Sequence, residues 1–303
     1  MMTATEHGDE ALPVHYIRAN DLEFAYLEAL PASTPSAKAA PLVLVLHGFP
    51  DTAQSYAEVV QQLADTGYHA VAPFLRGYQP SELPEDGDYS VLALGRDVIA
   101  LMEHFGADQA FLVGHDWGAL AAYAAAALRP DRIRGIVTFG VPHPRRVLLR
   151  PSLAQLTALD YAFKFQWPLW AERRIKMNGF AWLIDLVKRW SPDWTPTEAY
   201  LAQLRTVFAD PARLKAALAY YRAVPGLLFT RNAWQFLLHP IQAPARVVCG
   251  ARDACMLPST FQESEHLFGA DYELIEMKGV GHAMVQEAPQ EFATLILEFL
   301  KRH

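Results

Sequence analysis

Short apolar runs alternate with helical patterns in two stretches of this 303-residue chain. The run Leu42–Leu46 (LVLVL) is apolar without interruption, which is typical of a strand buried on both faces of a parallel sheet. Other apolar runs predict strands at Val14–Ile17, Leu22–Leu27, Tyr68–Pro73, Ala110–Gly114 and Ile133–Phe139. Helical spacing predicts helices at Ser55–Thr66, Val91–Phe105 and Ala119–Leu128. This alternation specifies an α/β fold with a mostly parallel central sheet flanked by helices on both sides.

Residues 142–240 follow a different pattern. They contain no convincing strand and are rich in helix formers, prolines and aromatic residues. Alternation then resumes with the strands Ala245–Cys249 and Tyr272–Glu276 and the helices Ser259–Phe268 and Pro289–Lys301. We therefore expect a core domain made of residues 1–141 and 241–303, interrupted by an inserted helical cap domain at 142–240. Because ligands bind at the carboxyl ends of parallel strands, a cap at that edge would line the site.

Composition limits the classes of partner. The net charge of -7 and the pI of about 5.9 argue against a nucleic-acid partner. The N-terminus lacks the pattern of a secretory signal, and no segment approaches the ~20 apolar residues of a membrane-spanning helix. We expect a cytoplasmic protein without membrane insertion; its oligomeric state cannot be read from the sequence. Two cysteines, Cys249 and Cys255, with no HExxH or CxxC pattern, predict no metal and no cofactor.

The segment Phe111–Ala119 (FLVGHDWGA) is the most informative about chemistry. A predicted strand runs through Gly114 to Asp116 and then, past Gly118, into a helix. This is the G-x-nucleophile-x-G elbow of α/β-hydrolase folds, in which the glycines allow a strained turn and close packing. The usual serine is replaced by Asp116, and no serine in the chain has the same flanking glycines. A carboxylate can displace a leaving group from an alkyl carbon and form an ester, which water must then cleave.

Asp116 could instead be only a helix N-cap, a favoured position for aspartate. Candidate partners favour the nucleophile, because triad members of this fold follow in the order nucleophile, acid, histidine. Asp253 comes just after the predicted strand Ala245–Cys249, and His282 lies between the last strand and the last helix. We expect His282 to activate water while Asp253 orients the imidazole and stabilises its charged form.

The segment Leu46–Pro50 (LHGFP) follows the apolar strand and should lie beside the elbow. In this fold the oxyanion hole uses the backbone N–H after the nucleophile and one from this loop, which here are Trp117 and Phe49. We expect His47 to have a structural role, since His282 already supplies the base. Pro50 is a candidate for a cis peptide bond.

The motifs HGFP, RGY (Arg76–Tyr78) and GHDWG, with the later GxxD and GH, resemble the epoxide hydrolases of the α/β-hydrolase fold. The resemblance covers roughly residues 40–300. It implies hydrolysis of a small apolar epoxide with water to a vicinal diol. Family members protonate the opening epoxide with two cap tyrosines. Tyr161, in LDYAFKFQWP, matches the first tyrosine, and Tyr221, in AYYRA, matches the second, with Tyr220 as the alternative register.

Haloalkane dehalogenases share the fold, the aspartate nucleophile and the Asp-Trp pair, and are the main alternative. They hold halide with N–H donors, typically an indole and an asparagine of the HG-x-P loop. Trp117 could provide the indole, but Phe49 stands at the asparagine position, which favours the epoxide. A non-catalytic small-molecule binding protein is a further alternative, disfavoured by the intact triad. The identity, enantiomer and attacked carbon of the epoxide cannot be read from the sequence, and neither can the physiological role.

Overall fold

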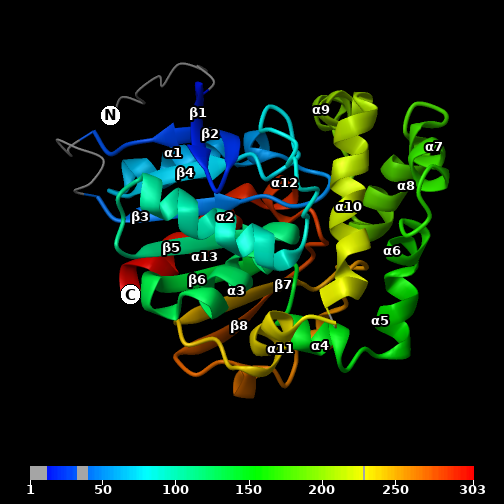
Figure 1. The fold of residues 1–303 in the computed structure, drawn as a ribbon. Helices are drawn as coiled ribbons and strands as arrows, with labels where there is room; N and C mark the ends of the chain where they lie inside the picture. Colours follow the sequence, from blue (N-terminus) through cyan, green and yellow to red (C-terminus); the bar gives the residue numbers. More distant parts are fainter. Residues whose placement is uncertain (1–11, 33–39, 228) are drawn as a thin grey trace, which may run out of the picture.

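The computed structural model, which describes residues 12–32, 40–227 and 229–303, contains an eight-stranded sheet with helices on both faces (Figure 1). The spatial strand order is β1-β2-β4-β3-β5-β6-β7-β8. The strands are β1 (Val14–Ala19), β2 (Leu22–Ala29), β3 (Leu42–Leu46), β4 (His69–Pro73), β5 (Ala110–His115), β6 (Ile133–Phe139), β7 (Ala245–Gly250) and β8 (Tyr272–Met277). Strands β3 to β8 form the parallel part of the sheet. Strand β2 pairs antiparallel with both β1 and β4. This confirms the predicted α/β fold.

Two helical layers cover the sheet and form two apolar cores. Helices α2 (Val91–His104) and α3 (Trp117–Leu128) pack on one face. Helices α1 (Ala57–Asp65), α12 (Met284–Glu287) and α13 (Pro289–Arg302) pack on the other. Strand β3 is buried along its whole length, as its unbroken apolar run predicted.

Only helices and loops occur between β6 and Pro240 in the described part of the chain. They are α4 (Pro144–Leu148), α5 (Leu153–Ala158), α6 (Asp160–Lys164), α7 (Trp170–Lys176), α8 (Ala181–Trp190), α9 (Glu198–Ala209), α10 (Pro211–Leu227) and α11 (Arg231–Leu238). Helices α5 to α10 stand at one end of the sheet, whereas α4 and α11 lie against the core beside α3 (Figure 1). That end carries the loops that follow β3, β5, β7 and β8. Among the described residues, no helix is long and apolar enough to cross a membrane.

The predicted helix Ser259–Phe268 is wrong. The structure has two short 3-10 turns there, at Pro258–Thr260 and Glu265–Leu267. Glu263 between them has a φ of 55°, which ends any right-handed helix at that position. The hydroxyl of Thr260 also donates to Oε1 of Gln155 in α5 at 2.8 Å, so a contact from a distant helix holds the turn. The prediction of a cytoplasmic protein rests partly on the N-terminal segment, and that segment lies mostly outside the described residues.

Candidate active site

The elbow at the end of β5 has the strained geometry that its glycines predicted. Asp116 lies between β5 and α3 with φ 53° and ψ -115°, a backbone region that non-glycine residues rarely adopt. A Cβ on Gly118 would collide with the carbonyl of Leu46, and one on Gly48 would collide with the Asp116 side chain. The Asp116 carboxylate makes no capping hydrogen bond to α3, so an N-cap role does not account for it.

His282 lies between the two predicted acids. Its Nδ1 is 2.8 Å from Oδ2 of Asp253, and its Nε2 is 3.6 Å from Oδ2 of Asp116. The other oxygen of Asp253 accepts the backbone N–H groups of Cys255 and Met256 at 2.7 and 2.9 Å. All three triad side chains are buried. The structure thus brings together three residues that are up to 166 positions apart in the sequence (282 minus 116).

The electrostatics of His282 depend on both carboxylates. Burial alone would lower its pKa, but Asp253, the Cys255 sulfur and Asp116 outweigh burial and raise the pKa well above 6.5. The resting imidazole is therefore stabilised in its charged form. Esterification of Asp116 would remove one of these negative charges and lower the pKa of His282, which favours the neutral form that a base needs.

Three residues without a predicted role hold the His282 loop in place. The Ser191 hydroxyl accepts the N–H groups of His282 and Ala283, both at 2.9 Å. The Nε2 of His115 is 2.8 Å from the carbonyl oxygen of His282, and its Nδ1 is 2.9 Å from the Tyr56 hydroxyl. Burial lowers the pKa of His115 to about 4, so its ring is neutral. Because a carbonyl only accepts, Nε2 carries the proton and Tyr56 donates to Nδ1.

Of these three, only His115 carried a sequence signal, because it precedes the nucleophile inside the elbow motif. Tyr56 and Ser191 lie in segments whose local sequence predicts nothing about His282. Asp51, just after the HGFP segment, is a further buried acid near this loop, and its Oδ1 accepts from Gln286 at 3.2 Å. Burial raises its pKa to about 7.

The HGFP loop places one predicted oxyanion donor on the nucleophile. The Phe49 N–H donates to Oδ1 of Asp116 at 2.8 Å, and the Phe49–Pro50 peptide bond is cis, as predicted. Trp117, the second predicted donor, is the first residue of α3, directly after Asp116. His47 is fully buried and its Nε2 accepts the N–H of Leu75 at 3.0 Å. Burial lowers the pKa of His47 to about 4, which fits the structural role that the sequence suggested.

Tyr161 on α6 and Tyr221 on α10 line one cavity together with Asp116. Their rings lie 5.8 Å apart, and the Tyr161 hydroxyl is 3.3 Å from the sulfur of Cys255. The Tyr221 hydroxyl is buried and makes no hydrogen bond of ordinary geometry among the described residues, although the nearby Trp117 indole partly offsets the effect of burial on its pKa. Burial raises the pKa of both phenols well above 10, so both stay protonated at neutral pH.

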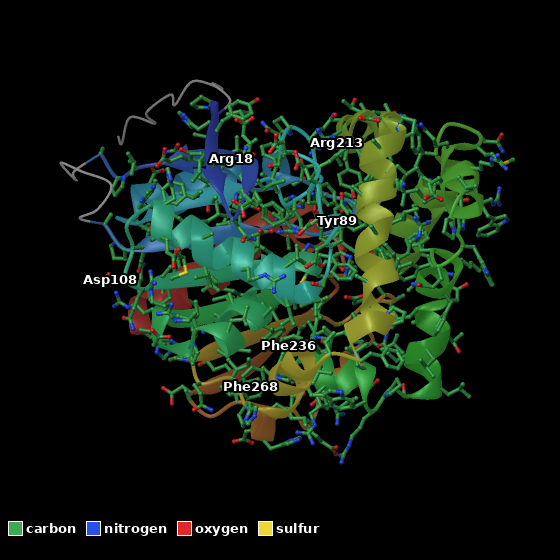
Figure 2. All side chains as sticks on the ribbon, in the orientation of Figure 1. Arg18, Tyr89, Asp108, Arg213, Phe236 and Phe268 are labelled. Carbon is green, nitrogen blue, oxygen red and sulfur yellow. The ribbon has the colours of Figure 1, made fainter. Side chains whose placement is uncertain are left out.

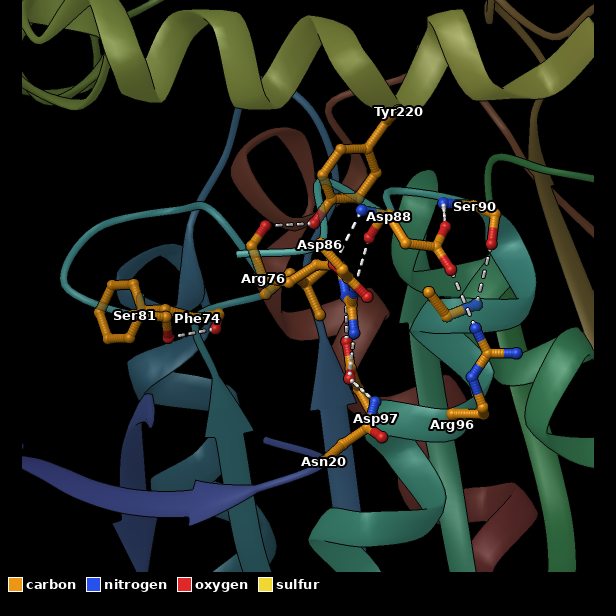
Figure 3. Close-up of polar contacts among 12 residues, drawn as sticks. Asn20, Phe74, Arg76, Ser81, Asp86, Asp88, Ser90, Arg96, Asp97 and Tyr220 are labelled. Carbon is orange, nitrogen blue, oxygen red and sulfur yellow. Dashed lines mark hydrogen bonds and ion pairs between the residues drawn. The ribbon is translucent and has the colours of Figure 1, made fainter. Parts of the chain in front are cut away.

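Tyr220 points elsewhere, toward the core segment below α10. Its hydroxyl donates to the carbonyl of Arg76 at 2.7 Å (Figure 3). The Arg76 guanidinium in turn makes two 2.6 Å bonds to Asp97, and this ion pair is buried. Arg213, at the start of α10 (Figure 2), also donates to the carbonyl of Ser81 at 2.5 Å. The alternative register with Tyr220 is therefore not supported, because its hydroxyl is used to attach α10 to the core.

One group of possible metal ligands occurs among the described residues. Asp253, Cys255 and His282 offer ligand atoms within 4.8 Å of one another. The carboxylate and the imidazole Nδ1 already bond to each other, and the thiol contacts Tyr161. The cluster therefore coincides with the triad, and the expected absence of a metal and a cofactor stays a prediction.

Comparisons with known proteins agree with this arrangement. Residues 41–289 match the family model described as alpha/beta hydrolase fold. Epoxide hydrolase A of Mycobacterium tuberculosis is 28% identical over 313 residues, covering 93% of this chain and 96% of that protein. The AB hydrolase superfamily protein YfhM of Bacillus subtilis is 28% identical over 265 residues, covering 86% and 90%.

Solved structures show the same likeness. An epoxide hydrolase from Vigna radiata superposes with a TM-score of 0.82 at 26% identity, covering 98% of this chain and all of that one. A putative epoxide hydrolase from Klebsiella pneumoniae superposes with a TM-score of 0.79 at 27% identity, covering 94% and 96%. The family match extends over more than half of the sequence and includes the elbow, both acids and the histidine. The chain is therefore a member of the α/β-hydrolase fold family.

Proposed function

We propose that this protein is an epoxide hydrolase that converts a small apolar epoxide and water to a vicinal diol through an ester on Asp116. One observation carries the proposal: a carboxylate at the nucleophile position and two protonated phenols, Tyr161 and Tyr221, face the same apolar cavity. The similar proteins named epoxide hydrolases support it. Residues 142–240 would act as the cap domain, since they supply both tyrosines. A cytoplasmic location and the absence of a nucleic-acid partner stay predictions from the sequence.

The first step forms the ester. Oδ1 of Asp116 already accepts the Phe49 N–H, whereas Oδ2 is 3.6 Å from His282 and is the freer oxygen. Oδ2 attacks a ring carbon and forms a C–O bond while the bond between that carbon and the epoxide oxygen breaks. The leaving oxygen takes a proton from Tyr161 or Tyr221, each of which can donate a hydrogen bond to it in the cavity.

The second step cleaves the ester. Once Asp116 is esterified, the charge that helped to keep His282 protonated is gone, so His282 passes its proton to the tyrosinate left by ring opening. The imidazole, now neutral, can accept a proton from water at Nε2. The resulting hydroxide attacks the carbonyl carbon of the ester. The oxyanion that forms on Oδ1 is stabilised by the Phe49 N–H and by the neighbouring N–H of Trp117. Collapse of this intermediate breaks the bond between the Asp116 carboxyl carbon and the substrate oxygen. The departing alkoxide takes the proton of the hydroxyl group that water supplied and leaves as the diol, which restores the Asp116 carboxylate beside protonated His282.

Dehalogenation is the second candidate, because one observation favours it. The indole Nε1 of Trp117 is buried and has no hydrogen-bond partner among the described residues, so it could bind a halide. The second donor expected in the HG-x-P loop is missing, since Phe49 occupies that position. A parallel assay of the purified protein on styrene oxide and 1-bromobutane distinguishes the two: diol without bromide supports the proposal, and bromide without diol overturns it.

A single-turnover experiment tests the ester itself. With enzyme in excess over styrene oxide in water labelled with heavy oxygen, the first diol should be unlabelled, because its new oxygen comes from Asp116. The label should then appear in the Asp116 carboxylate. Labelled diol in the first turnover would mean that water attacks the epoxide directly. Asp116→Ala should abolish turnover, and Tyr161→Phe/Tyr221→Phe should be severely impaired.

A further inference from the structure

The free space next to Asp116 lies mainly on one side of its carboxylate. A cavity of about 130 Å³ extends from Asp116 past Trp117 and the two tyrosines toward α4 and α11. Val141, Leu148 and Phe236 form its far walls, and Phe236 lies where α11 meets the core (Figure 2). Apart from Asp116 and the tyrosines, its described lining is apolar. An apolar cavity of about 150 Å³ holds one benzene ring, so this one suits a substituent of about that size.

An aromatic wall packs against the two tyrosines, and none of its members lines the cavity. Phe49 of the HGFP loop, Phe165 after α6, Trp190 of α8 and Phe208 of α9 form this wall. The Phe49 ring lies 5.8 Å from Phe165, 6.3 Å from Trp190 and 5.5 Å from Phe208. Each of the four side chains is at most 2% exposed, so the wall is packed from both sides. Phe49 is also fixed from below, because its N–H binds Asp116.

In the described part of the chain, the space that adjoins Phe49 and Trp190 on the His282 side is very small. It measures about 10 Å³ and is lined by Asp51, Tyr200 and His282 among others. That volume is about enough for one water molecule. None of its lining residues also lines the larger cavity. Among the described residues, the space on the His282 side has room for water, whereas the cavity toward α4 and α11 has room for an organic substituent.

We propose that the substrates are terminal epoxides with one apolar substituent of about the size of a single ring, and that trans-disubstituted epoxides are excluded by the aromatic wall. This inference rests on the proposed function. When Asp116 attacks one ring carbon and the tyrosines hold the oxygen, substituents in trans on the two carbons point in opposite directions. One of them enters the cavity, and the other must enter the wall of Phe49, Phe165, Trp190 and Phe208.

The test compares styrene oxide with trans-β-methylstyrene oxide and trans-stilbene oxide on the native enzyme. One misplaced methylene costs about 10- to 200-fold in kcat/KM, and a packed wall should discriminate at the upper end. We expect kcat/KM to fall roughly 100-fold for the added methyl group and trans-stilbene oxide to be inert. Comparable kcat/KM values for the three would overturn the inference while the proposed function stands. Turnover of none of the three would overturn both.

Matched Phe→Ala variants identify the wall as the cause. Phe208 contacts the Phe49 ring but makes no ring contact with Tyr161 or Tyr221, so Phe208→Ala should let Phe49 move aside. The ratio of kcat/KM for trans-β-methylstyrene oxide over styrene oxide should then rise at least about tenfold. Phe236→Ala is the control: it enlarges the open cavity and should leave that ratio within about twofold. An equal rise in both variants, with thermal unfolding showing both folded, would contradict the wall as the determinant.

Discussion

The adjacent residues Tyr220 and Tyr221 allow a paired test of the site, because their hydroxyl groups have opposite surroundings. The Tyr220 hydroxyl donates to the Arg76 carbonyl in a fully buried contact, whereas the Tyr221 hydroxyl makes no hydrogen bond of ordinary geometry among the described residues and faces the cavity with Asp116. Tyr220→Phe removes a hydrogen bond and no reactive group. Tyr221→Phe removes a proton donor and no hydrogen bond stronger than the contact with the Trp117 indole.

The magnitudes follow from these surroundings. A buried carbonyl left without its donor costs about 1–3 kcal/mol, so Tyr220→Phe should lower the free energy of unfolding by that amount. With an unfolding entropy of about 2.1 cal/mol/K per residue, this corresponds to a fall in Tm of roughly 2–5 °C for a chain of this length. Tyr221→Phe should leave Tm unchanged or slightly raised. Loss of one general acid should instead lower its kcat/KM by about 100-fold or more.

Thermal unfolding by circular dichroism and steady-state hydrolysis of styrene oxide measure both quantities. We expect Tyr220→Phe to retain kcat/KM within about tenfold, because α10 is still held by Arg213. The assignment of Tyr221 as the proton donor would be refuted if the pattern were reversed. That result would be a large loss of activity in Tyr220→Phe with normal activity in Tyr221→Phe.

Three further predictions address the triad and the attachment of α10. The variant His282→Gln should still open the epoxide ring but should cleave the resulting ester very slowly. Intact-protein mass spectrometry after mixing with styrene oxide should therefore find one substrate mass added to the protein. No adduct together with normal turnover would contradict the role of His282 as the base. In Asp116→Asn, the lost negative charge should lower the pKa of His282 from its raised value, so imidazole NMR should show deprotonation at lower pH than in the native enzyme. The charge of Asp116 stabilises the fold while His282 is protonated, and this contribution should be present below the unfolded pKa of 6.5 and lost as pH rises through the folded pKa. Asp97→Asn breaks the buried pair with Arg76 and should cost about 3–5 kcal/mol, or roughly 5–8 °C in Tm. Asp131→Asn, in an exposed pair, is the control and should leave Tm unchanged.

Local patterns were sufficient to predict most of the fold and the candidate triad. The unbroken run of β3 and the glycines around Asp116 are short-range features, because a strand period and a strained turn are specified by neighbouring residues. Parallel strands end at one edge of the sheet, so residues just after β5, β7 and β8 must meet there. This is why Asp116, Asp253 and His282 could be identified before their distances were known.

The tertiary structure decided what depends on contacts between distant segments. The predicted helix at Ser259–Phe268 is wrong because α5 holds Thr260 and Glu263 turns the chain. The sequence leaves open, by a register of one residue, whether Tyr220 or Tyr221 faces the cavity. The rotation of α10 decides this, because it directs the Tyr220 hydroxyl to the Arg76 carbonyl. The aromatic wall combines rings from four segments whose periodicity indicates only burial. Local sequence specifies which side chains are apolar, but close packing in three dimensions determines which of them face one another and where space for a substrate remains.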